Sequence, residues 1–475
     1  MEKRKEEYQA RLDHLKERLR IKENFDVIAR PIAIGGRDAC LFFVDGFAKD
    51  DILEKILEFL MSLPPEEVDA VLTADAFASR FVTYVEVDIQ DERQNPHTVV
   101  TQVLSGQIAL MVEGLPQVLL IDARTYPVRS VEEPDTDRVL RGSHDGFVET
   151  LVFNTALIRR RIRSPQLTMD IQQVGAVSKT DVVVCYMADK VDPAFLDKVK
   201  KKIQSITIPS LTMGQESLAE CLVKRQWFNP FPKMRYTERP DCAAASLLEG
   251  RILLLVDNSS AAMILPTSIF DFIQDTNDYY FPPLVGSYLR LVRALVFIAT
   301  LFLTPVWYLL VRNPEVLPEW LRFIQIQEPN TVPLFLQLMT VELIIDGIKL
   351  ASLNTPNVLN NAFGVVGALI LGEFAVSAGL FVPEVLLYMA FVAIANFTQP
   401  SFELGYAFKL FRMLFLVFIA LADWWGFGAG VLLMILCMVT TPTVCNSGYL
   451  YPLIPFNWKA IRRLLFRRAL SSDNS

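Results

Sequence analysis

The feature that most constrains the fold of this chain is the near absence of charge from its C-terminal part. Residues 363–408 contain no lysine or arginine, and residues 413–458 contain a single charged side chain, that of Asp423. A bilayer core about 30 Å thick is crossed by a helix of about 20 apolar residues. Apolar runs of this kind follow one another here, so the sequence predicts a helical membrane domain.

The preceding part of the chain has the pattern of a soluble α/β region. It begins with a charged segment, residues 1–24, in which Tyr8, Leu12, Leu15 and Leu19 recur at the spacing of an amphipathic helix. This segment lacks the apolar stretch of a signal peptide. We therefore expect the soluble region to lie on the cytoplasmic side of the membrane.

The soluble region contains an internal repeat. The segments DACLFFVDGFAKDDILEKIL and DVVVCYMADKVDPAFLDKVK align Asp38 with Asp181 and Leu53 with Leu196. A second pair, ALMVEGLPQVLLI and LLLVDNSSAAMIL, follows in the same order and has turn residues between two β-rich runs. Two matches in the same order predict two homologous α/β subdomains.

The expected fold is therefore an α/β soluble region of two duplicated subdomains followed by a polytopic α-helical membrane domain. The expected divisions are an amphipathic helix at 1–24, subdomains at 25–130 and 150–268 with a charged linker at 131–149, a connector at 269–288, the membrane domain at 289–457 and a basic cytoplasmic tail at 458–475.

Six apolar runs are candidate membrane spans. They lie at residues 289–311, 332–351, 361–381, 384–399, 408–422 and 427–444. The second contains Glu342, Asp346 and Lys349, so it is either a full span or a re-entrant segment. The sequence thus predicts five or six spans.

Basic residues are concentrated on the cytoplasmic loops of membrane proteins. With six spans, Lys409 and Arg412 fall at a cytoplasmic turn and the basic tail is also cytoplasmic, whereas Arg312 and Arg322 do not fit the rule. Both termini are therefore expected in the cytoplasm.

Ionisable residues inside a membrane are costly, and they are functional candidates for that reason. Glu342, Asp346 and Glu373 are the candidates for lining a pore, because a ring of acids repeated by oligomer symmetry favours cations. The alternative for Asp346 is an ion pair with Lys349, three positions further along the same helix.

Two further groups of residues are candidates for contacts. Small residues let helices approach closely in lipid, and Gly364, Gly367 and Gly372 could pack helices within one subunit or between subunits. Four arginines lie near the end of an expected helix, and they either have solvated heads at the helix terminus or contact lipid headgroups or a neighbouring subunit. These are Arg159, Arg160, Arg161 and Arg163.

The sequence gives no sign of catalysis. The histidines lie apart, and no nucleophile-elbow, zinc-protease, phosphate-loop or dinucleotide-binding pattern is present. We expect no catalytic residue, no cofactor and no metal site. The net charge of -7 argues against a nucleic-acid partner, and six cysteines without paired spacing indicate reduced thiols.

Several segments, among them NTALIRRRIRSPQL, SKTDVVVCYM and VELIIDGIKLASLNTPNVLNNAFGVVGALILGEF, resemble the A subunits of spore germination receptors. Within this family, the compact N-terminus with FFVDGFAKDD is most similar to the stage V sporulation protein AF branch. The resemblance covers residues 30–457. It implies a protein of the spore inner membrane that assembles as an oligomeric cation channel, together with another spore membrane protein.

The leading functional hypothesis is therefore a channel-forming or channel-associated subunit that acts in germination, with membrane lipids and further copies of the chain as partners. The second is a scaffold, in which the α/β subdomains assemble other germination proteins and the spans only anchor them. A secondary transporter comes third, because the repeat lies in the soluble region and not in the spans.

Overall fold

The computed structural model describes the chain apart from residues 1, 49, 72, 84, 92, 125–141, 225, 276, 327–331, 355–374, 447 and 467–475. The chain divides into two compact units. The sheet unit comprises Met1–Lys224, Met234–Thr267 and Val444–Ser447, and the helical unit comprises Arg225–Lys233, Ser268–Thr443 and Gly448–Ser475.

The sheet unit contains two five-stranded antiparallel sheets with equivalent strand orders, β1-β2-β4-β5-β3 and β6-β7-β9-β10-β8. The first sheet is formed by β1 (Val27–Ile34), β2 (Arg37–Val44), β3 (Glu86–Gln90), β4 (Ile108–Val112) and β5 (Val118–Asp122). The second is formed by β6 (Leu167–Val174), β7 (Thr180–Met187), β8 (Arg235–Thr237), β9 (Ile252–Val256) and β10 (Ala262–Leu265).

The two sheets confirm the predicted pair of α/β subdomains. Strands β2 and β7 occupy equivalent positions in the alignment that matches Asp38 with Asp181, and both are buried over their last six residues. The hairpins β4–β5 and β9–β10 turn at Gly114 (φ 85°) and Asn258 (φ 60°). Glycine and asparagine are the residues that adopt positive φ most readily, which explains the turn chemistry in both copies.

Helices cover both faces of each sheet. In β2, Leu41 and Phe43 face one core, while Cys40 and Phe42 face the other. Strands buried on both faces lack polar alternation, as the apolar runs of the sequence indicated. The first sheet is covered by α2 (Asp50–Ser62), α3 (Pro65–Asp69) and α4 (Ala74–Phe81) on one face and by α1 (Glu2–Arg18) and α5 (Pro96–Leu104) on the other.

The second sheet has the same three layers. One face packs against α7 (Pro193–Gln204) and α8 (Gln215–Leu222), and the other against α6 (Leu151–Arg161) and α9 (Pro240–Leu248). All six cysteines are free thiols, and Cys40 and Cys185 lie in the cores of the two subdomains.

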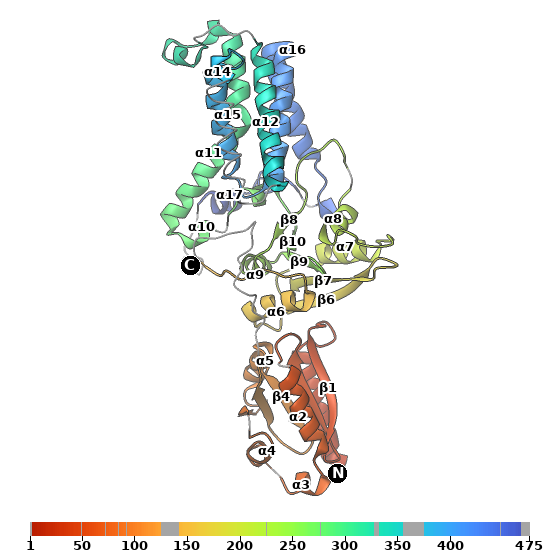
Figure 1. Ribbon diagram of the computed structural model, residues 1–475. Helices are drawn as coiled ribbons and strands as arrows, with labels where there is room; N and C mark the ends of the chain where they lie inside the picture. Colours follow the sequence, from red (N-terminus) through yellow and green to blue (C-terminus); the bar gives the residue numbers. More distant parts are fainter. Residues whose placement is uncertain are drawn as a thin grey trace. The chain divides into compact units, whose positions relative to one another are not determined.

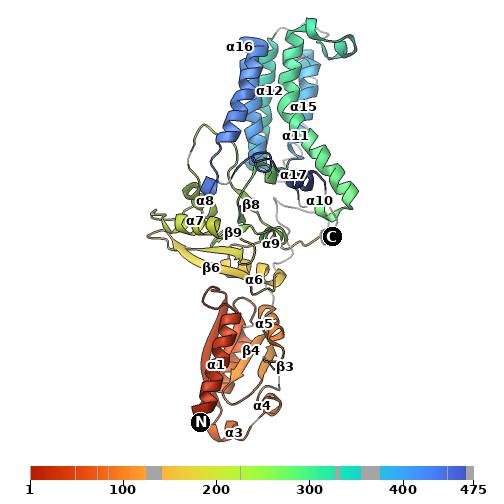
Figure 2. The ribbon, with the colours of Figure 1, turned by 180° about the vertical axis from the view of Figure 1, so that it is seen from behind.

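The helical unit is built around four helices that Figures 1 and 2 show side by side. These are α11 (Pro283–Arg312), α12 (Leu334–Asn354), α15 (Pro383–Asn396) and α16 (Phe402–Thr440). Shorter elements are η1 (Ile269–Phe272), α10 (Asn277–Tyr280), η2 (Pro314–Val316), η3 (Glu319–Ile324), α14 (Ala375–Ser377) and α17 (Trp458–Leu465), while η5 (Val444–Asn446) belongs to the sheet unit.

Among the described residues, α11 and α16 are long and apolar enough to cross a membrane. The second predicted span is one continuous helix, α12, of 21 residues. The fourth corresponds to α15, which has 14 residues. Most of the third, including Gly364, Gly367 and Gly372, lies outside the described residues, so the total of five or six spans stays a prediction.

Helix α16 is a hairpin of two antiparallel helices. Its backbone leaves helical geometry at Ala422 (φ -142°) and Asp423 (φ 45°). Across this corner, Gly426 of the second half lies against the carbonyl of Phe418 of the first half. Gly430 lies against the ring of Phe415, so the two halves run in opposite directions. The predicted fifth and sixth spans correspond to these halves.

Candidate functional site: a charge cluster in the helical unit

Four charged side chains from two helices meet inside the helical unit. Glu342 and Asp346 are separated by one turn of α12, and Lys409 and Arg412 by one turn of α16. Residues three or four positions apart share a helical face. The sequence thus places two acids on one helix and two bases on the next, and the packing of α12 against α16 brings them together.

Arg412 joins three helices at this cluster. Its side chain is fully buried, and its Nε donates to Oε1 of Glu342 at 2.5 Å. Its Nη1 donates to the backbone carbonyl of Thr300 on α11 at 2.6 Å. The side chain of Gln399 donates in turn to Oγ1 of Thr300 at 3.2 Å. One guanidinium therefore links α11, α12 and α16.

Lys409 is shared between the two acids. Its ammonium lies 3.2 Å from Oε2 of Glu342 and 2.5 Å from Oδ1 of Asp346, and it donates to the backbone carbonyl of Glu342 at 2.9 Å. The ammonium of the nearby Lys349 lies 5.6 Å from the ring centres of both Phe397 and Tyr406. Asp346 is thus held by a lysine of another helix, a partner that the spacing on α12 does not reveal.

The two candidate pore acids differ in accessibility. The side chain of Glu342 is 1% exposed, and each of its carboxylate oxygens is within an ion pair. The side chain of Asp346 is 30% exposed. Within a single chain, Glu342 is therefore an internal counter-ion, and Asp346 is the carboxylate that can meet water or a neighbouring subunit. Glu373 lies outside the described residues.

The partners of these acids correct one prediction from the sequence. Lys409 and Arg412 were expected at a turn, but both lie inside helix α16 and are buried. A buried charge requires an opposite charge and hydrogen bonds, and Glu342 supplies both. The sequence did contain a signal for this pairing. Two bases lie one turn apart in one apolar helix, and two acids lie one turn apart in another.

Arg312, which does not fit the rule that basic residues lie on cytoplasmic loops, also has a specific partner. Its Nε lies 2.8 Å from Oδ1 of Asp423 at the corner of α16, and its Nη1 donates to the carbonyls of Ile419 and Ala420. These carbonyls belong to the end of the first half of the hairpin. Arg312 therefore caps that helix and neutralises the charge of the corner.

The structure also corrects the expectation for Arg159, which is fully buried in the sheet unit. Its Nε and Nη2 donate to the two carboxylate oxygens of Asp26, each at 2.9 Å. Asn24 accepts from Arg159 at 3.3 Å and from the amide of Met169 at 3.0 Å. Arg159 thus ties the segment before β1 to the second subdomain, so it is not accessible to lipid or to a second subunit.

The other arginines of this run are accessible to different degrees. Arg161 pairs with Asp145 at 3.0 Å and Arg160 is half-buried, whereas Arg163 is exposed. A contact with a partner or with lipid stays a prediction for these three.

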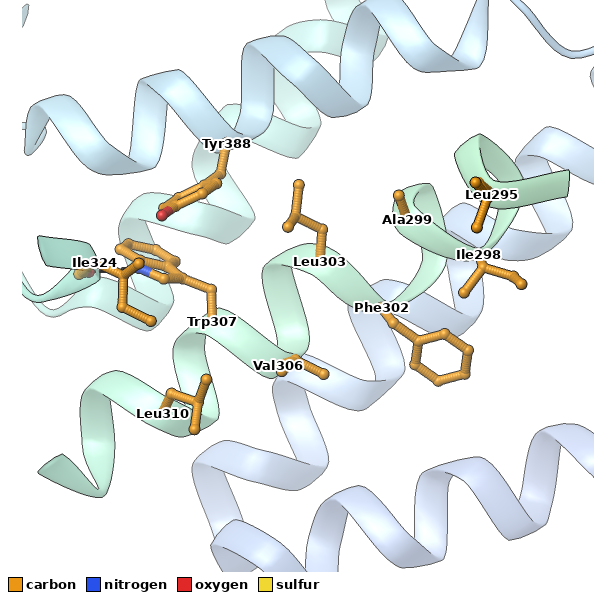
Figure 3. A pocket seen from close by; sticks show the side chains of 10 residues that line it. All are labelled: Leu295, Ile298, Ala299, Phe302, Leu303, Val306, Trp307, Leu310, Ile324 and Tyr388. Carbon is orange, nitrogen blue, oxygen red and sulfur yellow. Dashed lines mark hydrogen bonds between the residues drawn. The ribbon is translucent and has the colours of Figure 1, made fainter. Parts of the chain in front are cut away.

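An apolar groove lies along one face of α11 (Figure 3) and has a volume of about 370 Å³. It runs from Leu295 to Leu310, and Ile324 and Tyr388 form its sides. Within this lining, the indole of Trp307 donates to the carbonyl of Ile324 at 2.9 Å, and its ring centre lies 4.8 Å from that of Tyr388. The apolar lining suits lipid tails or another helix and gives an ion no ligands.

A duplicated α/β region joined to apolar helices with buried charges fits the class of membrane proteins, and α11 and α16 are the described helices long and apolar enough to cross a bilayer. The chain belongs to the GerA family, since the model of the Bacillus/Clostridium GerA spore germination protein matches residues 13–475. This confirms the resemblance seen in the sequence, and it makes the chain a germination-related membrane protein.

Two relatives from Bacillus subtilis agree with this membership. The stage V sporulation protein AF of Bacillus subtilis (strain 168) is 37% identical over 459 residues, which cover 96% of this chain and 92% of that protein. Spore germination protein KA of the same strain is 28% identical, with 93% and 81% covered. A crystal structure of the N-terminal domain of the A subunit of the Bacillus megaterium spore germinant receptor GerK3 is 25% identical and covers 53% of this chain and 92% of that chain, with a TM-score of 0.41.

Proposed function

We propose that this chain is a multi-pass subunit of a germination complex in the spore inner membrane, with both termini in the cytoplasm. In this proposal, several copies form or contribute to a channel that releases cations during germination. Family membership and the names of the relatives support the role in germination. The partners are further copies of the chain, another spore membrane protein and the surrounding lipids.

The observation that carries the conduction proposal is the partly exposed carboxylate of Asp346 in the mainly apolar helix α12. Ionisable groups in spanning helices face a bundle interior or a water-filled path and mark ion routes. In an oligomer, one Asp346 from each copy would form a ring of acids, which favours cations over anions. Glu342 holds Arg412 and Lys409 in place beside this ring, and Glu373 is a further pore candidate.

The test is cation flux through liposomes that contain the full-length chain, alone or with its co-purified partner. Asp346→Asn preserves the size of the side chain and removes its charge, so we expect potassium flux to fall several-fold. Glu319→Gln is the matched control, because Glu319 is 89% exposed on η3 and lies outside the cluster. Equal flux in wild type and Asp346→Asn would contradict the assignment of Asp346.

A non-conducting scaffold is the second candidate. The buried pair Arg159–Asp26 supports it, because this pair joins parts of both subdomains into one unit that can hold other proteins. In this case, a chain whose helical unit is replaced by unrelated spanning helices would still restore germination. Failure of that chimera, at normal protein levels, would favour the channel.

A further inference from the structure

We propose that the segment 451–466, which we call the tail patch, binds the anionic phospholipid surface of the leaflet at which α11 enters the membrane. This inference requires that the helical unit crosses a membrane. It is independent of whether the chain conducts ions, so the two proposals can fail separately.

The first observation is a run of exposed apolar side chains. Large apolar groups that gather at a surface indicate an interaction site. Phe456 and Trp458 are 71% and 64% exposed, and the other members of the run are between 43% and 59% exposed. The exposed apolar residues of the tail patch are Tyr451, Leu453, Ile454, Phe456, Trp458 and Phe466.

The second observation is the two-sided character of α17. The helix begins at Trp458, and the side chain of Asn457 caps it by accepting from the amide of Ala460 at 3.2 Å. At about 100° per residue, Lys459, Arg462 and Arg463 fall within one arc, and the apolar residues fall within the opposite arc. A short helix with basic and apolar faces is the pattern of an interfacial membrane anchor.

The third observation is the position of α17 in the helical unit. Arg290 in the first third of α11 donates to the carbonyl of Leu464 at 3.3 Å. Both views place α17 beside α10 and the start of α11 (Figures 1 and 2). The apolar part of α11 follows Arg293, so α17 lies at the level where α11 passes from water into lipid.

Phospholipid is the occupant that fits these three observations together. Headgroup phosphates lie at this level in any bilayer that α11 crosses. Tryptophan and tyrosine favour the interface between headgroups and acyl chains, while lysine and arginine are attracted to anionic headgroups. The tail patch presents both residue types at the same depth.

The experiment is hydrogen exchange of the full-length chain in nanodiscs of phosphatidylcholine, with or without phosphatidylglycerol. The variant is Lys459→Gln/Arg462→Gln/Arg463→Gln. Three basic residues near an anionic surface correspond to about a hundredfold in binding. We expect the amides of α17 to be protected from exchange in anionic nanodiscs. This protection should fall by up to about a hundredfold in the variant, and it should also decrease in high salt.

The matched control is Lys198→Gln/Lys201→Gln/Lys202→Gln, which removes the same charge from α7 in the sheet unit. This control should retain the protection of α17. Exchange of the β2 and β7 amides in the same samples reports whether each variant is folded. Equal protection of α17 in neutral and anionic nanodiscs would overturn the proposal.

Discussion

Arg159 and Arg412 are fully buried, and each is held by a carboxylate from a distant part of the chain, Asp26 and Glu342. A run of arginines at a helix end predicts surface cations, because the sequence does not show which side chain turns inward. The partner of Arg159 lies before β1, in another subdomain. Such pairs depend on tertiary packing and were beyond prediction from local pattern.

The first prediction concerns Arg159. Arg159→Gln leaves Asp26 buried without its counter-ion, which costs about 3–5 kcal/mol. Arg163→Gln is the control, because Arg163 is exposed. It should change the free energy of unfolding by less than about 0.5 kcal/mol. The free energies of unfolding of both variants are measured by denaturant unfolding of the purified chain, with hydrogen exchange of the β6 amides as the probe. Equal stabilities of the two variants would contradict the role given to the buried pair.

The second prediction concerns the thiol of Cys40. Burial raises the pKa of Cys40 to about 11, and burial also raises the pKa of Cys185. At pH 8 both thiols stay protonated and covered, so alkylation should be much slower than at Cys221, which is partly exposed. The folded state keeps the proton of the Cys40 thiol up to a higher pH than the unfolded state does. The stabilising contribution of Cys40 is therefore lost as the pH rises from about 9 to about 11.

Mass spectrometry of the alkylated peptides measures these rates. Rapid labelling of Cys40 at pH 8 in folded protein would show that the first sheet does not bury this side chain.

At the scale of elements, the α16 hairpin depends on a close approach of its two halves. A Cβ atom added at Gly426 would lie 1.9 Å from the carbonyl oxygen of Phe418, which is backbone and cannot rotate away. At Gly428 the same atom would meet nothing within 4 Å. The structure thus assigns different roles to two glycines only two positions apart.

The third prediction follows from this contrast. Gly426→Ala should destabilise the helical unit by about 1–3 kcal/mol or more, whereas Gly428→Ala should be neutral. Thermal unfolding of the detergent-solubilised chain, together with its yield, measures the difference. Similar melting temperatures for both variants would show that the halves do not pack in this way.

The helices and strands also show which parts of the fold could be predicted from the sequence. The duplication of the α/β subdomains could be predicted, because strand, turn and helix patterns repeat in the same order, whereas the three layers of each subdomain were not predicted. The charge cluster could be predicted only in part. Glu342 and Asp346 were visible as acids in an apolar helix, but their pairing with Lys409 and Arg412 depends on how α12 packs against α16.

The helical hairpin illustrates the same limit. The candidate packing glycines of the third predicted span lie outside the described residues, whereas Gly426 and Gly430 in the second half of the hairpin lie close to residues of its first half. A glycine in an apolar run does not itself reveal whether a neighbouring backbone approaches it. That information lies in the crossing of helices far apart in sequence.

At the scale of the whole molecule, the chain combines a duplicated α/β sheet unit with a unit of apolar helices that holds buried ion pairs. Membership of the GerA family assigns this combination to spore germination. We propose that the helical unit contributes a path for cations, with Asp346 on that path.

The most direct test is potassium release from germinating spores of the organism that carries this chain. Spores with Asp346→Asn, at wild-type protein level, should release potassium more slowly than wild type, and spores with Glu319→Gln should match wild type. If Asp346→Asn spores release potassium at the wild-type rate, while deletion of the chain slows release, then the chain acts in germination without conducting through Asp346, and the proposed cation path is contradicted.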